Sequence, residues 1–147
     1  MAIVNKKSDV LAEIRQTFGL VPEWIQELPD SALPGFWALM RDFYLAETKI
    51  PNKYKELIGI AVSGATRCRY CQLFHTEGAR LAGATDEEIA EAATMAGVTM
   101  MGSTYLNSMG TDFDQFRRET LEIVEYVRVQ QREQAKLPGK AAPSARV

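Results

Sequence analysis

The amino-acid sequence predicts an all-α fold, a single-domain helical bundle of about six helices. Along most of the 147-residue chain, apolar residues recur every three or four positions, which is the spacing of one face of a helix. The alternation of polar and apolar residues that marks a half-buried strand is absent. The chain is 46% hydrophobic and 24% charged, a composition typical of folded proteins and unlike that of disordered ones.

Three helical segments are predicted before residue 50. Ser8 is expected to cap the first helix and Gly19 to end it. Pro22 opens a short helical turn, and Asp30 or Ser31 is expected to cap the next helix. The apolar residues of these segments are Val10, Leu11, Ile14 and Phe18, then Trp24, Ile25 and Leu28, then Phe36, Trp37, Met40, Phe43 and Tyr44.

The next two helices are predicted on either side of Ser63-Gly64. Pro51 lies near the first position of one helix, where a missing N–H costs little, and glycine at position 64 is expected to weaken its end. The other helix is expected to begin near Thr66 to Cys68 and to stop at Gly83. The apolar positions of the earlier helix are Tyr54, Leu57, Ile58, Ala61 and Val62.

Two more helices are predicted after residue 84. Thr85 and Glu88 fit a capping box, in which each side chain bonds the free backbone N–H of the other residue. The long helix that follows is rich in small residues and methionine and is expected to break at Gly110, before a final helix. We predict one helical domain over residues 1–135 and a mobile C-terminal tail over 136–147, whose composition is small and basic.

Charge and hydropathy exclude several classes of protein. Lysine plus arginine number 17 against 19 acidic residues, a net charge of -2, so no basic excess indicates binding to nucleic acid or to an anionic membrane. No run of about 20 apolar residues is present to span a bilayer, and the opening MAIVNKKSDV does not resemble a signal peptide. A cytoplasmic, reducing location is therefore expected.

The reactive residues of the chain gather in one segment. The 2 cysteines and the single histidine are Cys68, Cys71 and His75. At roughly 100° per residue the three side chains fall within a sector of about 60° on one helix face. In a reducing compartment, a close cysteine pair is more often redox-active or metal-binding than structural.

Several features favour ionisation of these thiols. Cysteines in the first turn of a helix lie near free N–H groups and the positive end of the dipole, which favour the thiolate. Arg67 and Arg69 add positive potential, and His75 is placed to accept the thiol proton directly or through water. An oxidant that converts one thiolate to sulfenic acid would then allow the second thiol to form a disulfide.

Two other interpretations of the segment stay open. Two thiolates and an imidazole supply three zinc ligands, but a structural zinc site usually takes a fourth, for which only Glu56 is a weak candidate. Buried cysteines also serve as small apolar packing residues. By periodicity alone, Glu56 is one solvated acidic residue among 19.

The stretch from Lys55 to Ile89 resembles the core of the alkylhydroperoxidase D-like (AhpD-like) proteins of the carboxymuconolactone decarboxylase superfamily. The family pattern is a glutamate, a C-x-x-C motif twelve residues later, and a histidine four residues after the second cysteine. Glu56, Cys68, Cys71 and His75 match this pattern. The resemblance implies the all-helical fold of the family and makes Glu56 a candidate site residue.

The resemblance implies a thiol-dependent peroxidase or disulfide oxidoreductase that acts in antioxidant defence. Cys71 would be oxidised to sulfenic acid, Cys68 would donate a proton and then act as the resolving thiol, giving the Cys68–Cys71 disulfide, and Glu56 would relay protons through His75 or water. The implied partners are a hydroperoxide substrate, a lipoyl or thioredoxin-like thiol reductant, and further copies of the chain in a trimer or hexamer. No metal or cofactor is predicted.

One position departs from the pattern of alkylhydroperoxidase D, which has a histidine between its cysteines where this sequence has Tyr70. Tyrosine, with a pKa near 10, is a poor relay base at neutral pH, so a generic thiol peroxidase or disulfide reductase is expected rather than a dedicated alkylhydroperoxidase. The alternatives are a non-enzymatic redox sensor and a carboxymuconolactone decarboxylase-type lyase, whose branch generally lacks the C-x-x-C motif.

Overall fold

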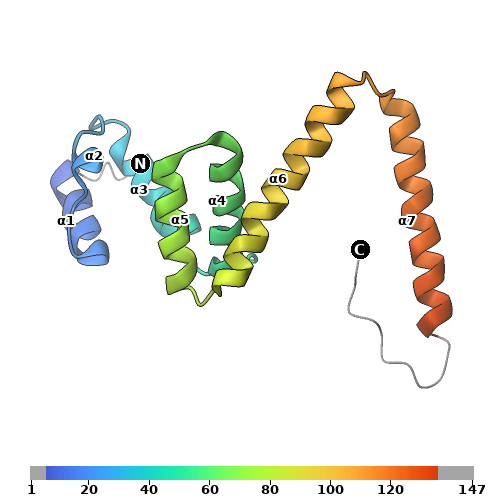
Figure 1. Cartoon of the computed structure of the whole chain (residues 1–147). Helices are drawn as coiled ribbons and strands as arrows, with labels where there is room; N and C mark the ends of the chain where they lie inside the picture. The colour runs from blue at the N-terminus through green and yellow to red at the C-terminus, as the bar shows by residue number, and fades with distance from the viewer. Residues whose placement is uncertain (1–5, 136–147) are drawn as a thin grey trace, which may run out of the picture. The chain divides into compact units, whose positions relative to one another are not determined.

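The computed structural model describes residues 6–135, which form helices and no strand (Figure 1). This confirms the all-α class, whereas the tail predicted for residues 136–147 lies outside the described residues. The elements in chain order are α1 (Lys7–Phe18), α2 (Glu23–Gln26), α3 (Leu33–Leu39), the π-helical turn η1 (Met40–Tyr44), α4 (Asn52–Thr66), α5 (Arg69–Leu81), α6 (Asp86–Ser108) and α7 (Phe113–Ala135).

The chain divides into two compact units, Met1–Met100 and Met101–Val147, with the boundary inside α6. All four predicted site residues belong to the first unit. The described part of the second unit consists of the end of α6 and the helix α7. That residues 1–135 act as one domain stays a prediction.

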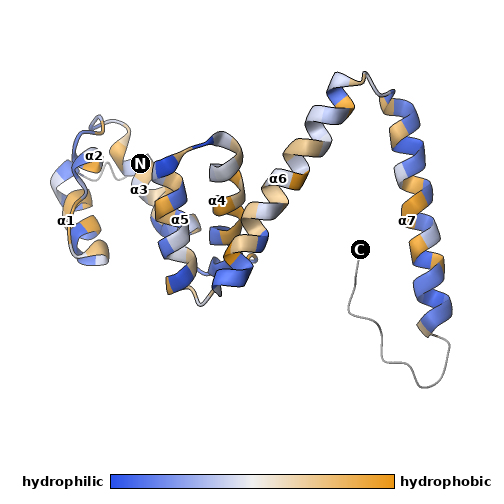
Figure 2. Cartoon of the chain, viewed as in Figure 1, coloured by the Kyte–Doolittle hydropathy of each residue, from blue (hydrophilic) through white to orange (hydrophobic). Residues whose placement is uncertain are grey.

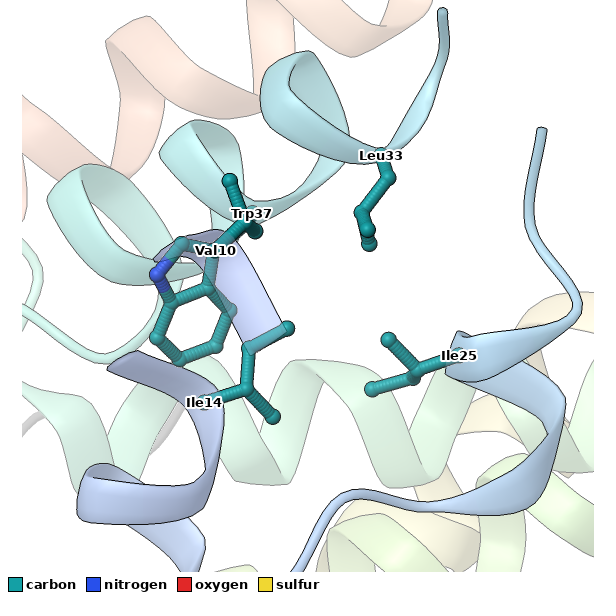
Figure 3. Close-up of a cluster of buried hydrophobic side chains, with 5 residues drawn as sticks. All are labelled: Val10, Ile14, Ile25, Leu33 and Trp37. Carbon is teal, nitrogen blue, oxygen red and sulfur yellow. The ribbon is translucent and has the colours of Figure 1, made fainter. Parts of the chain in front are cut away.

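A hydrophobic cluster in the first unit joins α1, α2 and α3. Its buried side chains come from one face of each helix (Figure 3): Val10, Ile14, Ile25, Leu33 and Trp37. The ring of Phe18 meets that of Trp37 nearly edge-on, with centroids 5.6 Å apart. Four of these five core residues lie at predicted apolar positions, whereas Leu33 was not predicted, and the predicted Trp24 and Phe43 are more than half exposed.

Two predicted caps are wrong. The α1 helix begins before Ser8, because the carbonyl of Lys6 already accepts the amides of Asp9 and Val10. The α3 helix follows a turn in which the carbonyl of Pro29 accepts two amides, so its N-cap is Ala32, without a side-chain hydrogen bond. The carboxylate of Asp30 instead binds the ammonium of Lys7, at 2.7 Å.

The α4 and α5 helices pack against each other as a hairpin and hold the candidate site. The predicted weakening at Ser63-Gly64 does not end α4, which continues to Thr66. Arg67 then takes a left-handed conformation with φ 57°, and Cys68 is the N-cap of α5. The buried hydroxyl of Ser63 donates to the carbonyl of Ile60, at 2.9 Å, so the helix end keeps its polar groups paired.

The face that α4 buries differs from the predicted one. The side chains of Tyr54, Ile58 and Val62, predicted to line the helix, are about half exposed in the chain, whereas Glu56 and Ser63 are buried. The reason is the close approach of α5, which favours small or hydrogen-bonded side chains on the facing surface. Periodicity identified the helix and two of its partly buried positions, Leu57 and Ala61, but not the buried Glu56, Ile60 and Ser63.

The later helices begin and end where the sequence predicts. Thr85 and Glu88 form the capping box, with N–H to oxygen distances of 2.9 and 3.1 Å. Gly110, with φ 62°, ends α6. Along α7, hydrophilic residues predominate between scattered hydrophobic ones (Figure 2). Within residues 6–135, no helix is both long and apolar enough to cross a membrane.

Candidate active site

The two cysteines lie at the start of α5 with their sulfur atoms 2.8 Å apart. Cys68 has an extended backbone at the N-cap, and its Sγ accepts a hydrogen bond from the backbone N–H of Cys71, at 3.4 Å. Both are free thiols; Cys71 is exposed and Cys68 is partly exposed. The helix thus begins beside Cys68 as predicted, and a sulfur occupies the place of the usual capping oxygen.

Hydrogen bonding makes the two thiols unequal. The hydrogen bond with the Cys71 thiol, followed by the backbone amide of Cys71, lowers the pKa of Cys68 below the ordinary thiol value. The same sulfur contact is the main cause of a raised pKa at Cys71. A hydrogen bond donated to a charged form favours that form. The first proton of the pair is therefore lost from Cys68.

The guanidinium of Arg69 has a different partner from the one the sequence suggests. It donates a hydrogen bond to the Tyr70 hydroxyl at 3.1 Å and lies 5.0 Å from the centroid of the Tyr70 ring. The neighbouring thiol and amide groups, not this arginine, are the main causes of the lowered pKa of Cys68.

A second cluster joins α4 to α5 through Glu56 and His75. Nδ1 of His75 lies 2.8 Å from Oε2 of Glu56, and the glutamate is only 8% exposed. The carboxylate therefore orients the imidazole through Nδ1. Since a carboxylate accepts the Nδ1 proton, the neutral ring keeps Nε2 unprotonated as a base.

Two glycines give this pair its space. A methyl group on Gly59 of α4 would overlap the His75 ring, and one on Gly78 of α5 would lie 2.7 Å from the carboxyl carbon of Glu56. Contacts that close force atoms to move. Each helix therefore has a glycine opposite the functional side chain of the other.

Tyr44, at the end of η1, is a site residue that sequence reasoning missed. Its hydroxyl donates to Oε1 of Glu56 at 2.6 Å and lies 3.2 Å from Nδ1 of His75. Burial and the neighbouring Glu56 raise the pKa of Tyr44 well above its usual value. The sequence placed Tyr44 on an apolar stripe, although a buried tyrosine hydroxyl usually needs a partner. A tyrosine on a predicted buried stripe was therefore the sequence signal that could have indicated a polar partner for Tyr44.

The structure brings the four predicted residues together as two pairs. Cys68 contacts Cys71, and Glu56 contacts His75. His75 follows Cys71 by one helical turn, a spacing of about 5–6 Å between Cβ atoms, and no hydrogen bond joins it to either cysteine among the hydrogen bonds of residues 6–135.

The zinc interpretation gains no support from this arrangement. Over the described part of the chain, no three His, Cys, Asp or Glu side chains are grouped so that they could hold a metal ion. Glu56, the candidate fourth ligand, is instead bonded to Tyr44 and His75.

Comparison with known proteins gives matches over the same region. The chain is 36% identical over 63 residues to the Paracoccus denitrificans protein called uncharacterized protein 4 in cox locus. This match covers 43% of the chain and 57% of that relative, so the chain spans little more than half of its length.

Two solved structures share the fold. The alkylhydroperoxidase AhpD core from Rhodospirillum rubrum superposes with a TM-score of 0.65 at 27% identity, over 74% of this chain and 82% of that one. A protein from Methanobacterium thermoautotrophicum superposes with a TM-score of 0.51 at 34% identity, over 60% of this chain and 97% of that one.

The family is shown by a match that includes the whole candidate site. The model of the carboxymuconolactone decarboxylase family matches residues 31–109, which is more than half of the chain. This range contains η1, α4 and α5, and with them both pairs of site residues. The chain is therefore an AhpD-like member of the carboxymuconolactone decarboxylase family.

Proposed function

We propose that the protein is a thiol-dependent peroxidase that cycles between a dithiol and a Cys68–Cys71 disulfide. The observation that carries the proposal is the pair of free sulfur atoms 2.8 Å apart at the start of α5, one turn before a histidine that a buried glutamate orients. The likeness to an alkylhydroperoxidase core supports the same chemistry.

In the proposed reaction, His75 takes the first proton of the thiol pair, and Glu56 stabilises the imidazolium. The remaining proton lies between the two sulfurs, and its transfer from Cys71 to Cys68 makes Cys71 the thiolate. Cys71 is the more exposed cysteine and is the one that we assign to meet the hydroperoxide.

The oxidation step then balances within the site. The Cys71 thiolate attacks the terminal oxygen of the hydroperoxide, so that an S–O bond forms, the O–O bond breaks and the peroxide is reduced to an alkoxide. Cys68 protonates the alkoxide to the alcohol and becomes a thiolate. It next attacks the sulfenic sulfur of Cys71, forming the disulfide and expelling hydroxide, which leaves as water with the proton from His75.

Regeneration requires two reducing equivalents from an external thiol. A dithiol attacks the protein disulfide, passes through a mixed disulfide, and leaves oxidised while both cysteines regain protons. A lipoyl or thioredoxin-like dithiol is the class of reductant that we propose. A redox sensor would be oxidised once and would not turn over.

Steady-state consumption of an organic hydroperoxide tests the proposal, with dihydrolipoamide, thioredoxin and glutathione compared as reductants. We expect many turnovers per chain with at least one dithiol and none in Cys71→Ser. Consumption of a single equivalent, followed by a stop with every reductant, would instead support the sensor. Equal rates in Cys71→Ser and the parent would refute the assignment of Cys71.

A further inference from the structure

We propose that Tyr44 is a positioning residue of this site, which holds the Glu56 carboxylate toward His75 and thereby keeps Nε2 of the histidine free to take the thiol proton. The inference deepens the proposed function and rests on it. The family pattern does not include Tyr44, and the sequence reasoning gave it only a packing position.

The hydrogen bonds around Glu56 assign Tyr44 this role. One carboxylate oxygen, Oε1, accepts from the Tyr44 hydroxyl at 2.6 Å, and the other, Oε2, faces Nδ1 of His75 at 2.8 Å. A carboxylate that is held at both oxygens cannot rotate without breaking a bond. The tyrosine therefore fixes the plane in which Glu56 meets the imidazole.

The Tyr44 hydroxyl is placed by the π-helical segment η1. At η1 the helix changes to π-helical turns, and the amide of Leu45 bonds the carbonyl of Met40 at 2.8 Å. Such single π-helical turns are rare and often occur at functional sites. The change sets the direction of Tyr44, the last residue of the turn.

Polar side chains of α4 anchor the end of η1. The ammonium of Lys55, the residue before Glu56, donates to the carbonyls of Phe43 and Ala46 at 2.7 and 2.6 Å. The amide of Asn52 donates to the carbonyl of Leu45 at 2.9 Å. The backbone on both sides of Tyr44 is thus tied to the helix that carries Glu56.

The groups around the Glu56 carboxylate keep the Tyr44 hydroxyl protonated, so that it remains a hydrogen-bond donor. The titratable groups hydrogen-bonded to Glu56 are Tyr44 from η1 and His75 from α5, while the charge of Lys55 is directed to backbone carbonyls. Burial and Glu56 raise the pKa of Tyr44, so its hydroxyl keeps its proton throughout the working pH range. It acts as a donor and takes no part in proton transfer.

The test compares Tyr44→Phe with the control Tyr54→Phe, which removes an equivalent hydroxyl from an exposed ring on α4. His75 is the single histidine of the chain, so the long-range ¹H–¹⁵N spectrum of the untagged protein reports its tautomer without ambiguity. The same samples give the rate of disulfide formation with an organic hydroperoxide.

We expect the parent and Tyr54→Phe to show protonated Nδ1 and bare Nε2 in the neutral ring. In Tyr44→Phe we expect a shift toward a mixture of tautomers and a rate about tenfold lower, the scale set by losing one hydrogen bond to a charged group. An unchanged imidazole spectrum in Tyr44→Phe would overturn the inference.

The parent alone can still refute the inference if Tyr44→Phe does not fold. A parent spectrum with the proton on Nε2 contradicts the inference, since Glu56 would then not be held against a protonated Nδ1. Failure of the proposed function looks different, because the parent would then form no disulfide with hydroperoxide whatever the imidazole spectrum shows.

Discussion

At the scale of single residues, the N-cap position gives two neighbouring thiols different properties. The Cys68 sulfur accepts the backbone amide of Cys71 and lies 2.8 Å from the Cys71 sulfur, and these contacts lower the pKa of Cys68. Cys71 has a raised pKa and the greater exposure. Cys68 is therefore the cysteine that carries the thiolate charge in the resting pair, and Cys71 is the cysteine exposed to solvent. Transfer of one proton over 2.8 Å exchanges these roles.

The unequal pKa values predict selective alkylation. Because the pKa of Cys68 is lowered and that of Cys71 is raised, iodoacetamide near neutral pH should modify Cys68 first, as measured by peptide mass spectrometry over a pH series. In Cys71→Ala the thiol donor is lost, so Cys68 should become reactive only at higher pH. Preferential labelling of Cys71 in the parent would contradict this electrostatic account.

Glu56→Gln tests the proton relay. Glutamine keeps the shape of the side chain but removes the charge that stabilises the imidazolium, so disulfide formation should slow about 100-fold, the lower range for a lost acid–base contribution. Stopped-flow measurement gives the rate, and circular dichroism gives the helix content. If the variant loses its helices, Glu56 is a structural residue rather than a part of the relay.

The predictable part of the site is the part that follows from spacing in one helix. Cys71 and His75 lie in α5 and Cys68 is its N-cap, so periodicity alone predicted that the three share one face. Glu56 required the family pattern, since nothing in its own helix distinguishes it from a solvated acid. Tyr44 depends on a π-helical turn, and no periodic pattern of apolar residues predicts where a helix will change its hydrogen bonding.

At the scale of elements, the site depends on how closely α4 and α5 approach. Gly59 and Gly78 permit that approach because neither has a side chain to occupy the space of His75 or Glu56. No sequence pattern distinguishes these two among the 10 glycines of the chain. Only the facing side chains of the other helix distinguish them.

Gly78→Ala tests this packing against the control Gly64→Ala. The new methyl in Gly78→Ala would meet the Glu56 carboxyl at 2.7 Å, whereas at Gly64 nothing lies within 4 Å. We expect Gly78→Ala to slow disulfide formation at least tenfold by displacing Glu56. Gly64→Ala should keep the parental rate and stabilise α4 by up to about 1 kcal/mol, as measured by denaturant unfolding.

Equal rates in the two glycine variants would contradict the proposed role of the helix contact.

Helix caps are predictable from sequence where both partners are local. Thr85 and Glu88 bond each other across one turn, and the sequence predicted this capping box. The caps predicted at Ser8 and Asp30 were wrong, since Lys6 starts its helix earlier and a distant lysine holds Asp30. A cap whose partners lie within one helical turn can therefore be predicted from sequence, whereas a contact with a residue distant in the chain cannot.

At the scale of the whole molecule, many large apolar side chains remain exposed in the single chain. On α6 and α7 they include Met95, Val98, Met101, Tyr105, Phe113, Leu121, Ile123 and Tyr126. Clusters of exposed large apolar side chains commonly mark protein–protein interfaces. The trimer or hexamer expected from the family resemblance would cover such surface.

Light scattering coupled to size-exclusion chromatography tests the expected assembly. We predict a molar mass of three or six chains at micromolar concentration, because burial of the apolar residues of α6 and α7 favours association. A mass of one chain over the whole concentration range would contradict the expectation of an oligomer. The redox proposal does not depend on this result.

The central claim concerns the dithiol, and single-turnover oxidation of the reduced protein tests it most directly. One equivalent of an organic hydroperoxide is added, and the intact mass and the connectivity of the cysteine peptides are measured. We predict a mass lower by two hydrogen atoms, a Cys68–Cys71 bond and one equivalent of alcohol, with a Cys71 sulfenic acid trapped in Cys68→Ser. A protein that retains both thiols and leaves the hydroperoxide intact would contradict the account.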